Sequence, residues 1–308
     1  MAKKVLVATF KPFAKAAVES ISEISQEAGY DLVLLESYID DYDLIRAVSD
    51  ADALIVRSDK VTPEVLDAAK NLKIVVRAGT GFDNVDLQSA TDHGVVVMNT
   101  PGQNSNAVAE LVFGLMLNLA RKAYTGKPGT ELKGKKFGLH AYGNVGVAVN
   151  NIARGFDMEV YAFDPYISKK KMKADGVKPV DSAEELYETC DYVSLHLPKM
   201  KETIGSVNYD LMSRMKKGAA IINTARKEVV DEPSLLKMLE EREDFLYAAD
   251  VAPDAREEIT EKYGVRTFFT AKKMGAQTAE ANVNAGIAAI NQIINFFKTG
   301  DTTFQVNK

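Results

Sequence analysis

Short β-branched runs alternate with helix-length segments along almost the whole chain. Strands that follow one another through helical crossovers pair in parallel, so this alternation predicts sheets covered by helices on both faces. The first expected strands are 5–8, 32–35, 53–56, 74–77 and 95–98. Between them, segments such as 14–27 and 63–69 carry apolar residues at helical spacing. We therefore expect an α/β fold.

A second cycle of strands follows the first. Its expected members are 136–142, 159–163, 192–196, 219–223, 246–250 and 267–269. A helical pattern at 108–121 joins the two cycles, and another at 281–297 follows both. In the simplest architecture the last helix returns to the first cycle. This predicts two doubly wound parallel-sheet domains, one built from residues 1–100 and 280–308 and the other from 101–279.

Composition excludes several classes of function. The net charge is −5 and no long run of Lys and Arg is present, which disfavours nucleic-acid binding. No apolar stretch reaches the roughly 18 residues of a membrane span, and no signal-peptide core follows Met1, so we expect a cytoplasmic protein. A single cysteine, Cys190, and three scattered histidines predict no disulfide and no metal site.

The segment 141–146 (AYGNVG) lies between a predicted strand and a predicted helix. This context is typical of a dinucleotide-binding loop, with Asp164, 18 residues beyond Gly146, placed to bind the ribose hydroxyls. An aspartate there repels a 2′-phosphate, so the predicted cofactor is NAD; the alternative role of Asp164 is a cap before Pro165. The expected cofactor contacts in the loop are Gly143, Asn144, Val145 and Gly146. Ala141 replaces the first glycine of the pattern, which is tolerable at an ordinary φ and otherwise alters cofactor affinity.

Four motifs resemble the D-isomer-specific 2-hydroxyacid dehydrogenases, and within them the short phosphoglycerate dehydrogenases. They are 76–86 (VRAGTGFDNVD), 99–104 (NTPGQN) with 108–110 (VAE), the glycine-rich loop, and 222–227 (INTARK). The resemblance implies that 101–279 is a Rossmann NAD-binding domain and that 1–100 with 280–308 is a flavodoxin-like substrate-binding domain. It also leads us to expect no regulatory extension beyond Lys308.

The resemblance also implies roles for single residues. Arg226 matches the catalytic arginine, whose fork suits a carboxylate and a carbonyl oxygen together. Ala78 and Gly79 match the backbone cradle of the substrate carboxylate. Matches to residues that hold the distal end of the substrate are Arg57, Ser58 and Asn104. Apart from the resemblance, Lys11 lies in the loop after the first expected strand and could add a second cation. Cofactor contacts are implied for Thr224, Ala225, His196 and Asp250, although a core histidine and a strand-end cap are the alternatives for the last two.

The acid/base pair of the family is altered. Its histidine should lie two residues before Gly275, where this chain has Lys273, and its glutamate five residues after Asp250, where this chain has Ala255. Either the site has lost its activity or it is rebuilt around a lysine base. A free lysine, with a pKa near 10.4, is a poor base at neutral pH. Partial burial and the neighbouring Arg226 would lower the pKa, and a carboxylate beside the lysine would oppose this, so the paired loss favours the rebuilt site.

The resemblance therefore implies a homodimeric, NAD-dependent enzyme that oxidises D-3-phosphoglycerate to 3-phosphohydroxypyruvate, the entry to serine biosynthesis. Two alternatives stay open. The substrate is another D-2-hydroxy acid such as glycerate, lactate or a branched-chain acid, or the protein is a non-catalytic NAD sensor. The intact Arg226 and the substrate-loop motifs favour an enzyme.

Overall fold

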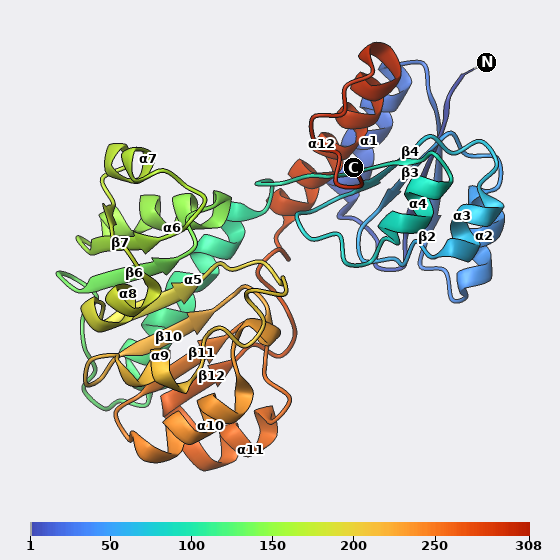
Figure 1. Ribbon diagram of the computed structural model, residues 1–308. Helices are drawn as coiled ribbons and strands as arrows, with labels where there is room; N and C mark the ends of the chain where they lie inside the picture. The colour runs from blue at the N-terminus through green and yellow to red at the C-terminus, as the bar shows by residue number, and fades with distance from the viewer. Residues whose placement is uncertain (1) are drawn as a thin grey trace. The chain divides into compact units, whose positions relative to one another are not determined.

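A computed structural model describes residues 2–308, which divide into two compact units (Figure 1). The first unit comprises the chain up to Asn104 together with Gln277–Lys308, and the second is Ser105–Ala276. Every strand pair in both sheets is parallel. The expected α/β class with two parallel-sheet domains is confirmed.

The first sheet has five strands in the order β2-β1-β3-β4-β5. Their bounds are β1 Lys4–Thr9, β2 Asp31–Glu36, β3 Ala53–Val56, β4 Ile74–Arg77 and β5 Val96–Asn99. The helices of this unit are α1 Lys15–Glu27, α2 Asp41–Val48, α3 Pro63–Ala68, α4 Leu87–Asp92 and α12 Ala279–Thr299. This strand order is that of flavodoxin-like folds.

Alternation along the strands explains why helices cover both faces of this sheet. Leu6 and Ala8 of β1 pack in the core beneath α2, α3 and α4, whereas Val5 and Val7 pack in the core that contains α1 and α12 (Figure 1). All four side chains have no exposed surface. The near-continuous apolar strands of the sequence are therefore strands buried on both sides.

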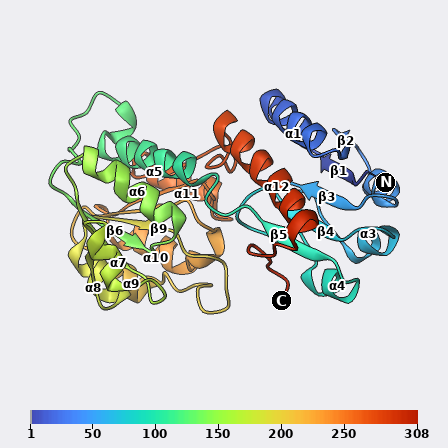
Figure 2. The same ribbon diagram turned by 90° about the horizontal axis from the view of Figure 1, so that it is seen from above.

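The C-terminal segment completes the first unit. α12 lies beside α1 (Figure 2), and Gly286 permits the close approach, because a Cβ there would lie 2.9 Å from Ile21 Cδ1. Beyond α12, the side chain of Asn307 accepts the Val97 amide at 2.8 Å and donates to the Val95 carbonyl at 2.8 Å. The tail thus caps β5, the edge strand, as a further strand would.

The second sheet has seven strands in the order β12-β11-β10-β9-β6-β7-β8. Their bounds are β6 Lys136–His140, β7 Glu159–Phe163, β8 Lys178–Pro179, β9 Tyr192–Leu195, β10 Ala220–Asn223, β11 Leu246–Ala249 and β12 Thr267–Phe269. This is the dinucleotide-binding order with one strand added.

Helices cover both faces of the second sheet as well. They are α5 Ser105–Ala120, α6 Asn144–Gly155, α7 Lys169–Ala174, α8 Ala183–Thr189, α9 Tyr209–Ser213, α10 Glu232–Glu241 and α11 Arg256–Tyr263, with short 3₁₀ turns at Lys122–Tyr124, Lys227–Val229 and Gly264–Arg266. α5 and α6 lie side by side (Figure 2) and share a core with α7, whereas α8 to α11 pack in the core of the other face. Three expected strands end earlier than predicted, β6 at His140, β9 at Leu195 and β11 at Ala249, because the chain turns there into loops. The two-residue edge strand β8 was not predicted, since Lys178–Pro179 has no apolar run.

Within residues 2–308, none of the helices combines the length and the apolar character that crossing a membrane requires.

Candidate functional site

The strand order of the second unit creates a crevice between β6 and β9. From β6 the chain proceeds outward through β7 to β8, and from β9 it proceeds the other way through β10 and β11 to β12. The crossovers therefore run in opposite directions from β6 and from β9. In sheets of this kind, ligands bind at the carboxyl ends of the two strands between which the crossovers diverge. The glycine-rich loop follows β6 and His196 follows β9. The topology thus brings these two predicted cofactor segments together.

The glycine-rich loop has the geometry of a pyrophosphate cradle. Gly143 is the N-cap of α6, and a Cβ added to it would meet no atom within 4 Å, which leaves room for a ligand. Asn144 and Val145 form the first turn of this 12-residue helix, whose amides and dipole favour an anion. A Cβ at Gly146 would lie 2.9 Å from the Ala141 carbonyl oxygen, so glycine is needed there for helix and strand to pack.

Ala141 adopts a strained conformation. Its φ is +82°, in the region that favours glycine. Alanine would be tolerated at an ordinary φ, and the structure shows that φ is not ordinary here. A left-handed conformation costs a non-glycine residue about 1–2 kcal/mol. The loop holds it nonetheless, because the Ala141 amide donates to the Phe163 carbonyl at 2.9 Å and the Tyr142 amide donates to Asp164 at 2.8 Å.

Asp164 fixes this loop through its carboxylate and lines the adjoining cavity. Besides the Tyr142 amide, its carboxylate accepts the amides of Tyr166 at 2.8 Å and Ile167 at 3.2 Å. A carboxylate offers about four acceptor positions, so three amides leave capacity for a ribose hydroxyl. The predicted ribose contact and its alternative, a turn cap, are therefore compatible roles of one side chain.

A cavity of about 810 Å³ opens beside Asp164. Its size lies within the range of about 300–1,000 Å³ for small-molecule sites. It is lined by His140, Ala141, Phe163, Asp164, Pro165, Tyr166, Ala183, Glu184, Leu197, Pro198, Met200, Glu202, Thr203, Ser206, Asn208, Asp210, Leu211 and Arg214. A cavity with apolar lining residues such as Phe163, Leu197 and Leu211, next to Asp164 and the glycine-rich loop, suits the adenosine half of a dinucleotide.

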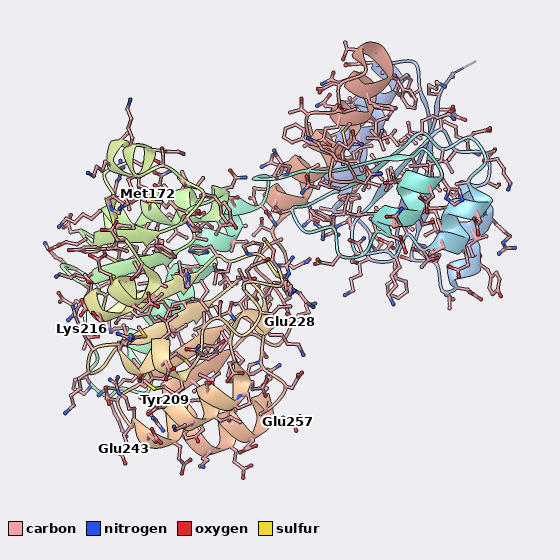
Figure 3. All side chains as sticks on the ribbon, in the orientation of Figure 1. Met172, Tyr209, Lys216, Glu228, Glu243 and Glu257 are labelled. Carbon is pink, nitrogen blue, oxygen red and sulfur yellow. The ribbon has the colours of Figure 1, made fainter. Side chains whose placement is uncertain are left out.

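One wall of this cavity is the loop after β9. Glu228, labelled in Figure 3, anchors that loop through both its side chain and its backbone. The ammonium of Lys199 lies 2.7 Å from its carboxylate, and the Gly205 amide donates to its carbonyl at 2.8 Å. The Glu228 carboxyl consequently has a lowered pKa, chiefly because Lys199 donates to it. Contacts within the protein therefore hold this wall of the cavity in place.

Two histidines lie at the carboxyl ends of β6 and β9; His140 is buried, and His196 is partly exposed with its ring nitrogen Nε2 buried. Burial lowers the pKa of His140 to about 4 and that of His196 to about 3, so both are neutral at physiological pH. His140 Nδ1 lies 3.2 Å from the Tyr187 hydroxyl. His196 Nε2 is buried without a hydrogen-bond partner among the described residues, a cost that a polar ligand group would remove.

The motif around Arg226 follows β10. Asn223 shapes this turn, because its side chain accepts the Ala225 amide at 3.0 Å and donates to the Arg226 carbonyl at 3.0 Å. The guanidinium of Arg226 is half-buried and donates to the Ala225 carbonyl at 3.0 Å. Thr224 Oγ1 is buried and, within residues 2–308, has no hydrogen-bond partner.

The turn that carries Lys273 is fixed by Asp250. The Asp250 carboxylate is 2% exposed and accepts the amides of Met274 at 2.6 Å and Gly275 at 2.8 Å. It also accepts the Thr270 hydroxyl at 2.9 Å, so it performs the alternative role of a strand-end cap whatever else it contacts. Lys273 itself is exposed. The partial burial expected to support a lysine base is therefore not observed.

A carboxylate does approach Ala255, although from another helix. Glu232, the first residue of α10, accepts the amides of Asp254 at 2.8 Å and Ala255 at 2.7 Å. These amides precede α11, so Glu232 caps a helix whose own N-cap residue, Ala255, has no polar side chain. The sequence register of Ala255 gave no sign of this long-range cap.

In the first unit, the crossovers diverge between β1 and β3. Arg57 and Ser58 directly follow β3 at this point, with Arg57 half-buried and Ser58 exposed. Burial lowers the pKa of Arg57, and the nearby Asp59 carboxylate opposes that shift. A topological switch point with a partly desolvated guanidinium is a sound place for an anionic ligand.

The Ala78–Gly79 cradle follows β4 in the same unit. Gly79 has φ +145°, a conformation that residues with a side chain rarely adopt, and a Cβ there would also require the Arg77 guanidinium to move. Its carbonyl accepts the Thr100 amide at 3.0 Å, and the Asn99 side chain donates to the Thr80 carbonyl at 2.6 Å. Asn104 joins the group, since its side-chain oxygen accepts the Thr80 hydroxyl at 3.3 Å. The backbone is thus held from its carbonyl side.

Residues 113–267 match the family model of the D-isomer-specific 2-hydroxyacid dehydrogenase NAD-binding domain. The chain belongs to the D-isomer-specific 2-hydroxyacid dehydrogenase family. This family membership and NAD as the cofactor are therefore confirmed, and the matched segment lies inside the second unit.

Individual members of the family resemble the whole chain. A D-3-phosphoglycerate dehydrogenase of Archaeoglobus fulgidus is 35% identical over 96% of this chain and 57% of its own length, so the chain spans a little over half of that relative. A hydroxypyruvate reductase of Thermotoga maritima is 34% identical over 85% of this chain and 90% of its own. A crystal structure of NAD⁺-bound 3-phosphoglycerate dehydrogenase from Entamoeba histolytica aligns with a TM-score of 0.92 and 44% identity over 100% of this chain and 99% of its own.

Several site residues were not foreseen from the sequence. Asp59, Tyr142 and Glu232 act through backbone contacts that join distant segments, which no local motif reveals. The cavity wall could have been predicted from the sequence, because Leu197 and Pro198, which line the cavity, directly follow the predicted cofactor contact His196. The acidic side chains that line the cavity, Glu184 of α8 among them, carried no such signal.

The cofactor site generates a first prediction. NADH is expected to bind at least tenfold more tightly than NADPH, because a 2′-phosphate would meet the Asp164 carboxylate in a cavity that also contains Glu184, Glu202 and Asp210. Calorimetric Kd values for both cofactors measure the ratio. Asp164→Asn removes one of these negative charges and should lower the ratio of the two affinities. Equal affinities for NADH and NADPH in the unaltered protein would contradict the assignment of Asp164 to the ribose.

Proposed function

We propose that this protein is an NAD-dependent dehydrogenase that oxidises D-3-phosphoglycerate to 3-phosphohydroxypyruvate, the first step of serine biosynthesis. Its family membership supports the reaction class. The observation that carries the substrate assignment is the half-buried Arg57 at the β1/β3 switch point, where a guanidinium can meet a phosphate. Formation of NADH with D-3-phosphoglycerate, compared with D-glycerate, is the direct test.

Each proposed site residue has a chemical task. Arg226 offers a planar fork of N–H donors to the substrate carboxylate and the oxygen on C2. The Ala78–Gly79 backbone receives the carboxylate as well, and Arg57, Ser58 and Asn104 bind the distal end. Lys273 takes the proton of the C2 hydroxyl. NAD, when bound, supplies the nicotinamide carbon that accepts the hydride from C2.

The cofactor contacts divide between the two halves of the dinucleotide. Gly143 to Gly146 receive the pyrophosphate and Asp164 the adenosine ribose. Thr224, Ala225, His196 and Asp250 are assigned to the nicotinamide half. Support comes from the buried polar atoms of His196 and Thr224, which gain a partner if ligand groups reach them.

A second candidate is an unphosphorylated hydroxy acid. The similarity to the hydroxypyruvate reductase of Thermotoga maritima favours D-glycerate and hydroxypyruvate as this alternative pair. Arg57 separates the two, because only a phosphorylated substrate brings a phosphate to its guanidinium.

The Arg57 prediction follows from that difference. Arg57→Ala should lower kcat/KM for D-3-phosphoglycerate by about 2–4 kcal/mol, the scale of removing one partner from a charged pair. The ratio of kcat/KM for phosphoglycerate to that for D-glycerate should fall with it. Arg57→Lys keeps the positive charge and loses the planar fork of donors. Its kcat/KM for D-3-phosphoglycerate should therefore lie between those of the unaltered enzyme and of Arg57→Ala. An equal loss on both substrates would instead make Arg57 a residue of the fold.

Lys273 has its own prediction. Lys273→Ala should lower kcat by a factor of about 10² or more, as removal of a general base does. NAD affinity, measured by calorimetry, should stay within a few fold. Oxidation by the unaltered enzyme should rise with pH, because the neutral amine is the base, and this rise should disappear in the variant.

The neighbouring lysine supplies the matched control. Lys272→Ala removes an exposed ammonium from the same turn and should leave turnover nearly unchanged. Wild-type turnover in Lys273→Ala would refute the assignment. A protein that binds NAD yet oxidises none of the candidate acids would be the non-catalytic sensor.

We also propose that the enzyme works as a homodimer in the cytoplasm. Members of the family usually dimerise through the cofactor domain, which supports the proposed homodimer. Sedimentation velocity should give twice the 33.7 kDa mass of the chain. A single species at the monomer mass over micromolar concentrations would contradict it.

A further inference from the structure

The loop between β1 and α1 lies against the proposed phosphate-binding arginine. Arg57 Nη1 donates to the carbonyls of Lys11 at 3.3 Å and Pro12 at 3.1 Å. The guanidinium carbon also lies 5.0 Å from the centroid of the Phe13 ring, a cation–π distance. One edge and one face of the arginine are therefore occupied by this loop, which fixes where its remaining donors can go.

The loop itself is firmly held. Asp59 is 5% exposed, and its carboxylate accepts the Phe10 amide at 2.5 Å and the Tyr38 hydroxyl at 2.7 Å. At the other end, Phe13 is buried in the core of the α1 and α12 face. The proline at position 12 restricts the backbone between these two anchors. Residues 10–13 thus form a fixed support beside Arg57.

Lys11 is placed by this support. Its carbonyl oxygen is 3.3 Å from Arg57 Nη1, so its Cα lies no more than about 6 Å from that nitrogen. Its side chain is exposed, whereas the backbone on either side is anchored. Both residues follow strands that flank the switch point, β1 and β3, where a parallel sheet receives its ligand.

Charge balance gives Lys11 a role that Arg57 cannot fill alone. The Asp59 carboxylate lies close enough to Arg57 to influence its pKa, and it offsets the charge of the guanidinium. One guanidinium and one carboxylate sum to zero, whereas a phosphate monoester carries close to two negative charges at neutral pH. A second cation restores a net positive charge at the subsite.

We propose that Lys11 is a substrate-specificity residue that forms, with Arg57, a two-cation subsite for the phosphate of a phosphorylated 2-hydroxy acid. The inference rests on the proposed function, since it assigns the distal group of the same substrate. The loop that positions Arg57 also delivers Lys11, so the subsite is a property of the β1–α1 connection and not of the Val-Arg-Ser segment alone.

Kinetics with two substrates test the proposal. Lys11→Ala should lower kcat/KM for D-3-phosphoglycerate about tenfold and Lys11→Glu about a hundredfold, with a smaller loss at high salt because the side chain is exposed. The ratio of kcat/KM for phosphoglycerate to that for D-glycerate should fall in step. Lys15→Ala, which removes an exposed ammonium four residues further on, is the matched control. An unchanged ratio in Lys11→Glu, or an equal effect of Lys15→Ala, would overturn the proposal.

Inorganic phosphate provides a readout that does not depend on turnover. Tens of millimolar phosphate should raise the Tm of the unaltered chain relative to chloride of equal ionic strength, and Lys11→Glu should abolish the increase. If phosphoglycerate is not oxidised but this phosphate effect depends on Lys11, the proposed reaction fails and the anion subsite stands. A phosphate effect that persists in Lys11→Glu would remove the subsite.

Discussion

Parallel strand pairing is the constraint on which the rest of the molecule depends. A parallel neighbour can be reached only through a crossover, so each strand must be followed by a helix, and all the carboxyl ends collect at one edge of each sheet. The loops that follow β6 and β9 therefore meet, as do those that follow β1 and β3. Segments far apart in the sequence are brought together without any direct attraction between them. The chemistry of the loops then decides what binds.

Strand-end aspartates turn these edges into rigid sites. Asp59, Asp164 and Asp250 each lie within three residues of a strand, and each accepts backbone amides from a loop that carries a proposed ligand contact. Charge-assisted hydrogen bonds of this kind are stronger than neutral ones, particularly where water is excluded. Asp164 is the clearest case, because its bond to the Tyr142 amide holds a loop in which Ala141 is strained. Aspartate thus fixes a loop near a strand end at three places in the molecule.

The sequence predicted the fold well because its signals are local. Apolar runs marked the central strands within a residue or two, and the glycine-rich loop was found from its strand and helix context. Long-range contacts were not predictable in the same way. Glu232 capping α11, and Asp59 holding the β1–α1 loop, join residues whose separation in the chain carries no pattern. The exposure of Lys273 and the positive φ of Ala141 depend on tertiary geometry, so chemical reasoning about residue types gave the wrong environment for both.

The order of elements along the chain also bears on how the molecule is made. Ser105–Ala276 is contiguous, so everything that this unit needs has been synthesised once Ala276 leaves the ribosome. The unit that begins the chain must wait longer, because α1 packs on α12 and the edge of β5 is capped by Asn307. Until then the apolar faces of β1 and α1 lack their cover. Residues 2–104 are thus synthesised well before Gln277–Lys308, the segment that completes their unit, and their apolar faces stay open to other partners in the meantime.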